Sequence, residues 1–310
     1  YLRYGWQVYK NATRADLVFL QGAVSEGLPG TLGAFFAGKP TVLRVPGDYA
    51  WEQYQQRVSL SNRERLEVFV TRAHRGSIRL LELIERWVAK RARRILVPSL
   101  YLKKIVGQWG IQSAQIDVVY NDVRPLPPPR LSRSEIRKQF GIASDARVLF
   151  SIARAVPWKG IEFLISLLKD LPSTHVLVVA GDGPLLEKWK TQIREQGLTN
   201  RVIFVGRWPH QELSDWFRAV DAFVLASGYE GFPHVAVEAA MQGLHGFLSD
   251  AGGNPETQHT MPGRTTILPY EDREAWLKAL SAPVFPQHED FQPSPQMGNQ
   301  VTAILRSISS

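Results

Sequence analysis

Short apolar runs alternate with amphipathic stretches along the second half of the chain. Runs of this length, rich in Val, Ile, Leu and Phe, are typical of strands buried on both faces of a parallel sheet. The pattern predicts strands at residues 147–152, 175–180, 202–205, 222–226 and 246–249. It predicts helices at residues 160–169, 184–196, 211–218, 233–242 and 272–280. This alternation favours a doubly wound α/β domain, in which ligands sit outside the carboxyl ends of the strands.

The first half of the chain shows the same alternation with fewer strands. Strands are predicted at residues 16–20, 41–45, 94–99 and 116–120, and helices at 28–38, 63–93 and 100–108. The region 63–93 is basic and amphipathic, and Ser99 is placed to cap the helix that follows it. We therefore expect a second parallel sheet of only about four strands.

A proline-rich segment separates the two halves. Residues 124–130 read Arg-Pro-Leu-Pro-Pro-Pro-Arg, and proline both fixes φ and removes a backbone donor. The segment predicts a stiff linker at 125–133. It divides a first domain at 1–124 from a second at 134–285, with a short helix near 134–140. In the remaining tail, 286–310, we expect a further helix at 296–308.

Composition excludes several kinds of chemistry. The 310 residues include no cysteine, which rules out disulfides, thiolate nucleophiles and cysteine-ligated metals. No apolar run approaches the ~20 residues of a membrane span. We expect a cytoplasmic protein. A peripheral position at the inner face of the membrane is a second expectation.

Positive charge is concentrated in the first half. Residues 1–140 hold 23 Lys and Arg against 11 Asp and Glu, whereas residues 141–310 hold 14 against 18. Most of the excess lies between Arg57 and Lys104. One interpretation is contact with an anionic membrane, which attracts basic segments by ~1 kcal/mol per residue; the other is a solvated helix face. Aromatic residues are not interleaved with these cations as a single-strand nucleic-acid groove requires, so we expect no nucleic-acid partner.

Two glutamates flank the predicted start of one helix. Glu230 lies in the loop after the strand at 222–226, and Glu238 lies about a turn and a half into the helix that Pro233 begins. The unpaired N–H groups of a helix N-terminus attract phosphate. Carboxylates on either side of such a site can accept hydrogen bonds from hydroxyl groups. This combination suits a nucleotide sugar.

The spacing of Glu230 and Glu238 resembles the Glu-x7-Glu signature of the retaining GT-B-fold glycosyltransferases of family 4, also called group 1. Segments 151–160, 181–184 and 252–256 carry the same resemblance in the family's order, and it extends from about residue 16 to 276. It implies two Rossmann-like doubly wound domains, with the first, acceptor-side domain truncated by roughly three strands. It also implies that the tail returns to the first domain.

The resemblance implies a role for each candidate residue of the second domain. Arg154 and Lys159 would neutralise the leaving diphosphate in place of a metal ion. Glu230 would hold hydroxyls of the donor sugar, and Glu238 would hold those of the ribose. The remaining donor-binding candidates are Gly231 and Phe232 through their backbone N–H groups, Pro233, Gly181, Gly183 and Arg207. For residues 181–184 a simple tight turn is the alternative, and Trp208 is either a base-packing or a core aromatic.

The main departure from the family lies at residues 45–49. Many relatives carry a histidine where this chain has Pro46, which cannot hydrogen-bond to a sugar. Asp48 remains as a candidate catalytic residue that would orient the acceptor hydroxyl or accept its proton. Alternatively, Asp48 caps the helical turn that follows.

The function implied is a retaining, metal-independent hexosyltransferase of cell-envelope polysaccharide synthesis. It would move a sugar from a nucleotide-diphosphate donor, with no cofactor, to a glycan or lipid-linked acceptor. The alternative is a non-catalytic nucleotide-sugar-binding protein, or a truncated remnant of such an enzyme. A third interpretation is an isomerase with the same fold, such as a nucleotide-sugar epimerase. A dehydrogenase is disfavoured because no Gly-x-Gly-x-x-Gly opens either half.

Overall fold

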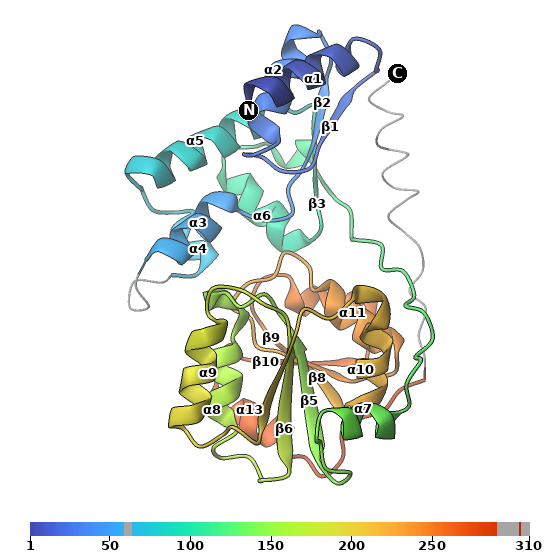
Figure 1. Ribbon diagram of the computed structural model, residues 1–310. Coiled ribbons are helices and arrows are strands. Elements are labelled where there is room, and N and C mark those ends of the chain that lie inside the picture. The colour runs from blue at the N-terminus through green and yellow to red at the C-terminus, as the bar shows by residue number, and fades with distance from the viewer. Residues whose placement is uncertain (59–63, 290–303, 305–310) are drawn as a thin grey trace. The chain divides into compact units, whose positions relative to one another are not determined.

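A computed structural model describes residues 1–58, 64–289 and 304, which fall into two compact units (Figure 1). The first unit contains Tyr1–Asp122 together with Ile304, and the second comprises the described part of Val123–Ser294. The division lies immediately before the proline-rich segment. No helix of the described chain is long and apolar enough to cross a membrane.

The first unit is built on a parallel sheet of four strands in the order β1-β2-β3-β4. The strands are β1 (Val18–Leu20), β2 (Thr41–Arg44), β3 (Arg94–Val97) and β4 (Ile116–Val118). The helices are α1 (Leu2–Ala12), α2 (Gly27–Phe36), α3 (Tyr49–Arg57), α4 (Leu66–Phe69), α5 (Gly76–Arg91) and α6 (Leu100–Gln108). Ser99 caps α6 by accepting from the Leu102 N–H at 3.1 Å.

Two features of this unit differ from the expected pattern. Helix α1 was not predicted, because no capping residue marks its start, although its apolar residues follow a helical period. The single helix expected at 63–93 is two helices, α4 and α5, with a non-helical stretch between them. The break ends at Gly76, whose φ of +61° lies in the left-handed region that interrupts a right-handed helix.

The second unit contains a parallel six-stranded sheet in the order β10-β9-β8-β5-β6-β7. Its strands are β5 (Arg147–Ile152), β6 (His175–Ala180), β7 (Val202–Gly206), β8 (Ala222–Leu225), β9 (Gly246–Ser249) and β10 (Thr265–Leu268). Its helices are α7 (Arg133–Gln139), α8 (Ile161–Leu167), α9 (Leu186–Glu195), α10 (Leu213–Ala219), α11 (His234–Met241), α12 (Thr257–Thr260) and α13 (Arg273–Leu280). Both units are therefore α/β with parallel sheets, as predicted, although β10 was missed. The strand order reverses between β5 and β8, which is where such sheets bind ligands.

Side chains of β5 alternate between two cores. Leu149 joins an apolar cluster with residues of α8, α9 and α13 on one face of the sheet. Phe150 points to the other face, where its ring stacks on Trp216 of α10 at 5.5 Å. Figure 1 shows α8 and α9 on one side of this sheet and α10 and α11 on the other. Burial on both faces explains the nearly continuous apolar runs of the sequence.

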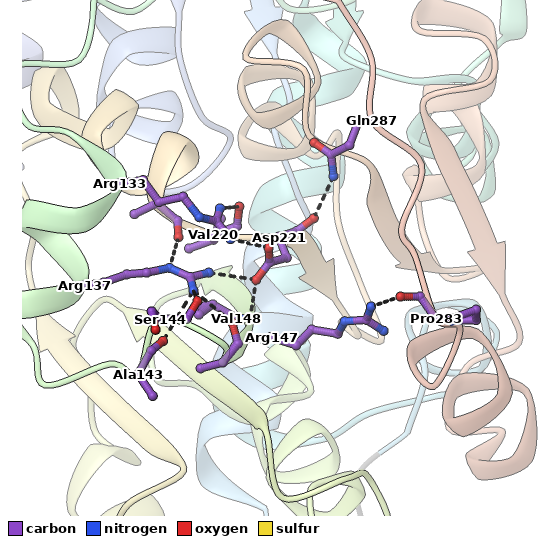
Figure 2. A network of polar contacts seen from close by, with 12 residues as sticks. Arg133, Arg137, Ala143, Ser144, Arg147, Val148, Val220, Asp221, Pro283 and Gln287 are labelled. Atoms are coloured by element: carbon purple, nitrogen blue, oxygen red, sulfur yellow. Dashed lines mark hydrogen bonds and ion pairs between the residues drawn. The ribbon is translucent and has the colours of Figure 1, made fainter.

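A buried arginine ties α7 to the amino ends of β5 and β8 (Figure 2). The Arg137 guanidinium donates to the carbonyls of Ala219 and Ala146, at 2.9 Å each, and to Asp221 Oδ2 at 2.9 Å. The same carboxylate accepts from the Val148 N–H at 2.7 Å. These contacts lie at the edge of the sheet opposite to the predicted site.

Most of the C-terminal tail lies outside the described residues, including the helix expected at 296–308. Beyond residue 289 the structure describes Ile304, which packs against the cluster of Val42, Leu96 and Val119 in the first unit.

Candidate functional site

Loops at the carboxyl ends of β5, β6, β8 and β9 converge in the second unit. The loop after β5 contacts the loop after β6, where the Ala155 N–H donates to the Asp182 carbonyl at 2.9 Å. It also contacts the loop after β8, where the Gly228 N–H donates to the Trp158 carbonyl at 2.8 Å. Four segments that are distant in sequence thus form one surface beside the point where the strand order reverses.

Lys159 from the loop after β5 and Glu230 from the loop after β8 form an ion pair. Lys159 ends the short 3-10 turn η3 (Pro157–Lys159), and its Nζ lies 2.6 Å from Oε1 of Glu230. The two side chains are 21% and 12% exposed, respectively. The structure therefore brings together a cation and an anion that the sequence places 71 residues apart.

Glycines permit the close backbone approaches around this pair. Gly160 has φ +68°, and a Cβ there would lie 2.0 Å from the Ala226 carbonyl oxygen. Gly252, at φ +62°, would bring a Cβ to 2.6 Å from both the N and the O of Glu230. The Gly253 N–H also donates to the Glu230 carbonyl at 2.8 Å. The backbone that carries Glu230 is thus supported by the loop after β9.

Gly181 and Gly183 lie against the β5 loop in the same manner. Their added Cβ atoms would approach the Ala153 carbonyl oxygen to 2.0 Å and the backbone of Ala155 to 2.8 Å. The side chain of Arg207 is exposed and pairs with Asp182 at 3.3 Å. Arg207 and this glycine turn are therefore neighbours.

Glu238 is buried inside α11, and its carboxylate has one described partner. Pro233 precedes the helix, and Glu238 lies more than one turn into it. Oε1 lies 2.7 Å from Nε2 of His210, whereas Oε2 is buried with no hydrogen-bond partner among the described residues. The side chain is 8% exposed, so Glu238 is not an ordinary solvated helical glutamate. A buried acceptor without a hydrogen-bond donor destabilises the ligand-free protein, and a hydroxyl group of a ligand could supply the missing donor.

The other candidates of this unit lie in the loops after β5, β7 and β8. Gly231 and the buried Phe232 connect Glu230 to the start of α11. Arg154 follows β5 and is exposed. Trp208 packs edge-to-face on Trp216 at 5.8 Å, which makes it part of an aromatic cluster with Phe140.

Asp48 belongs to the first unit, where both of its carboxylate oxygens have protein donors. Oδ1 accepts from the Trp51 N–H at 2.8 Å and caps α3, and Oδ2 accepts from Trp109 Nε1 at 3.3 Å. Burial raises the pKa of Asp48 to about 6. Asp48 therefore caps α3 and is 2% exposed, whereas its role toward the acceptor hydroxyl stays a prediction.

The sequence did not single out two contributors to the site. Gly252 appeared only as part of a family marker, and its contact with Glu230 could not be read from spacing. His210 carried no signal beyond its position after a strand. Among the described residues, no group of three or more His, Asp or Glu side chains forms a cluster suited to a metal ion.

Comparison with known proteins identifies related sequences in both units. The family model described as "Glycosyl transferases group 1" matches residues 132–279, and that described as "Glycosyltransferase Family 4" matches residues 1–125. Putative glycosyltransferase EpsF of Bacillus subtilis is 32% identical over 47% of this chain and 39% of its own length. The 2-deoxystreptamine N-acetyl-D-glucosaminyltransferase of Streptomyces fradiae is 27% identical over 74% of this chain and 53% of its own length. The chain thus spans about half, or less, of these curated relatives.

Solved structures share the fold. Anabaena Alr3699/HepE in complex with UDP and glucose gives a TM-score of 0.72 at 21% identity, over 98% of this chain and 78% of that one. The lipopolysaccharide outer core galactosyltransferase WaaB gives 0.63 at 20% identity, over 98% of this chain and 80% of that one. These likenesses show that the chain has the GT-B fold.

Proposed function

The chain belongs to family 4 of the GT-B-fold glycosyltransferases, and we propose that it moves a sugar from a nucleoside diphosphate to a glycan or lipid-linked acceptor. We propose further that the transfer retains the anomeric configuration and needs no metal ion. The observation that carries the proposal is the Lys159–Glu230 ion pair at the convergence of four loops.

Lys159 supplies the positive charge that the leaving group needs. When the bond between the sugar C1 and the phosphate oxygen breaks, both bonding electrons stay on the β-phosphate. A fixed cation beside that oxygen lowers the barrier because it needs no reorganisation. The exposed Arg154 supplies a second cation with a forked geometry. The acceptor oxygen then bonds to C1, and its proton passes to the departing phosphate.

Glu230 has a second role in this scheme. Without a donor it is held by Lys159 at 2.6 Å, and with a donor it accepts hydrogen bonds from the sugar hydroxyls. The amino end of α11 places the positive end of the helix dipole beside the phosphates, although the N–H groups of His234 and Ala236 already donate to the Phe232 and Pro233 carbonyls. The buried Oε2 of Glu238 then accepts from a ribose hydroxyl.

Nucleoside diphosphate release from a panel of nucleotide sugars, with and without chelator, tests the proposal. We expect release that is insensitive to chelator. Lys159→Ala should reduce kcat/KM by ~30- to 150-fold, the equivalent of ~2–3 kcal/mol of transition-state stabilisation. Lys169→Ala, at an exposed lysine of the same unit, is the matched control.

Three results would separate the alternatives. Turnover that survives Lys159→Ala contradicts the phosphate clamp, and sensitivity to chelator contradicts the metal-free mechanism. Nucleotide binding without turnover on any acceptor favours the non-catalytic nucleotide-sugar-binding protein instead. The two units would then serve recognition alone.

We also propose that the first unit contacts an anionic membrane through α5. This helix buries its acidic residues Glu82 and Glu85 and exposes Leu80 and Leu83 to solvent. Lys90 and Arg91 at its end are exposed. Apolar and cationic groups therefore face outward together, as they do in interfacial helices. Such contact would bring the protein to a lipid-linked acceptor at the inner face of the membrane.

Vesicle flotation tests this contact. The protein should float with anionic vesicles at low salt and not with zwitterionic ones, because charge screening weakens surface attraction. Leu80→Ser combined with Leu83→Ser should reduce the floated fraction, whereas Val284→Ser, at an exposed apolar residue of the second unit, should not. Equal flotation of both variants would mean that α5 is a solvated face.

A further inference from the structure

His210 is the described side chain that contacts the Glu238 carboxylate. It lies in the 3-10 turn η4 (His210–Glu212) after β7, and its Nε2 is 2.7 Å from Oε1 of Glu238. Its side chain is 65% exposed, whereas that of Glu238 is 8% exposed. The contact therefore reaches from the surface of the protein to a carboxylate inside it.

The two oxygens of Glu238 have different environments. Helix α11 buries the residues on either side of Glu238, so its carboxylate has lost most of its hydration. Oε1 recovers a donor from His210, and Oε2 has none among the described residues. A hydrogen bond at one oxygen restricts rotation of the carboxylate. The other oxygen is thereby held in a defined direction, as a preorganised acceptor.

We propose that His210 is a positioning residue for nucleotide recognition. It holds Oε1 of Glu238 and so directs Oε2 at a ribose hydroxyl of the donor nucleotide. This inference rests on the proposed function, in which Glu238 binds the ribose. His210 acts through Glu238 and not on the diphosphate or the sugar, so its loss weakens binding of the nucleotide and appears in KM more than in kcat.

Substitutions at position 210 separate positioning from simple packing. Glutamine retains an N–H donor that can reach Oε1, whereas alanine removes the donor. We expect His210→Ala to weaken nucleoside diphosphate binding roughly tenfold or more, since hydrogen bonds to charged groups are worth more than neutral ones. His210→Gln should recover most of that loss. His259→Ala, at an exposed histidine of the same unit, should bind like the wild type.

The experiment is calorimetric titration of the full chain with UDP, GDP and ADP, and then with the 2′-deoxy form of the nucleotide that binds. The wild type should prefer the ribonucleotide, and His210→Ala should lose most of that preference. In a Glu238→Ala background, His210→Ala should cause little further loss, because the two residues act as one unit. Thermal unfolding of each variant without ligand verifies that it is folded.

Each contrary outcome has a distinct meaning. If the wild type binds none of the three nucleotides, the proposed function fails and this inference fails with it. If the wild type binds and His210→Ala binds equally well, only the positioning role is overturned. The positioning role is also overturned if His210→Gln binds the nucleotide as weakly as His210→Ala. It is overturned as well if His210→Ala weakens nucleotide binding as much in the Glu238→Ala background as in the wild type. The last result would mean that His210 contacts the nucleotide itself.

Discussion

Replacement of Arg137 by alanine should destabilise the second unit far more than replacement of its neighbour Arg133. Arg137 is 4% exposed and donates to the backbone carbonyls of Ala146, Ser144 and Ala219 as well as to Asp221 (Figure 2). Arg133 is 43% exposed and contacts the Val220 carbonyl and the same aspartate. Both arginines hold α7, but only the first is buried.

The magnitude follows from the contacts that would be lost. Three carbonyl acceptors would lose a buried donor at about 1 kcal/mol each, and Asp221 would lose one charged donor. Asp221 is 25% exposed and still accepts from Arg133 and from the Val148 N–H. The carboxylate therefore loses only part of its stabilisation. We expect a total of roughly 3–4 kcal/mol for Arg137→Ala. For the exposed Arg133 we expect about 1 kcal/mol or less.

Hydrogen exchange under native conditions measures this difference within the second unit. The free energy of exchange of the slowest amides in β5 and β8 should fall by about these amounts in each variant. The free energy of unfolding in urea should rank the two variants in the same order. Arg137→Lys keeps the charge but offers no planar fork to several acceptors, so it should recover less than half of the loss. If Arg137→Ala lowers the free energy of unfolding by no more than Arg133→Ala does, then the buried hydrogen bonds of Arg137 do not stabilise the packing of α7.

Three further predictions concern strain and pH. Gly252→Ala should destabilise the second unit and lower activity, because its Cβ would lie 2.6 Å from the Glu230 backbone; unchanged unfolding and turnover would contradict this. Burial raises the pKa of Asp48 to about 6 and raises that of Glu85. The folded first unit therefore retains protons that the unfolded chain releases, and stability falls as pH rises from about 4 through 6. Asp48→Asn keeps an acceptor for the Trp51 N–H but turns its amide nitrogen toward the Trp109 Nε1–H, which costs the same at every pH. Relative to the wild type, the variant should therefore be more stable at pH 7 than at pH 4.5 in urea denaturation; a pH-independent difference would refute the assignment. Burial lowers the pKa of His245 to about 4, so the second unit should lose stability as pH falls from 6.5 toward 4, seen as lost amide protection around β9.

Local pattern predicted most of the second unit. The runs at β5 and β6 are continuous and apolar because both faces of the sheet are covered, so their signal does not depend on which strand lies beside them. β10 (Thr265–Leu268) has only four residues and two threonines, and α1 lacks a capping side chain. A strand as short as β10 depends on tertiary packing for its existence, whereas α1 has a helical apolar period without a start signal.

The sequence by itself determined the α/β class, the position of the proline-rich break and the residues available for chemistry. It did so because hydrophobic period and turn chemistry are properties of neighbouring residues. Only the tertiary structure decided that Lys159 pairs with Glu230 and that His210 is hydrogen-bonded to Glu238. It also decided that Asp48 serves as a helix cap with both oxygens occupied. Such pairings depend on strand order and on backbone approaches of a few ångströms between loops, which sequence spacing does not encode.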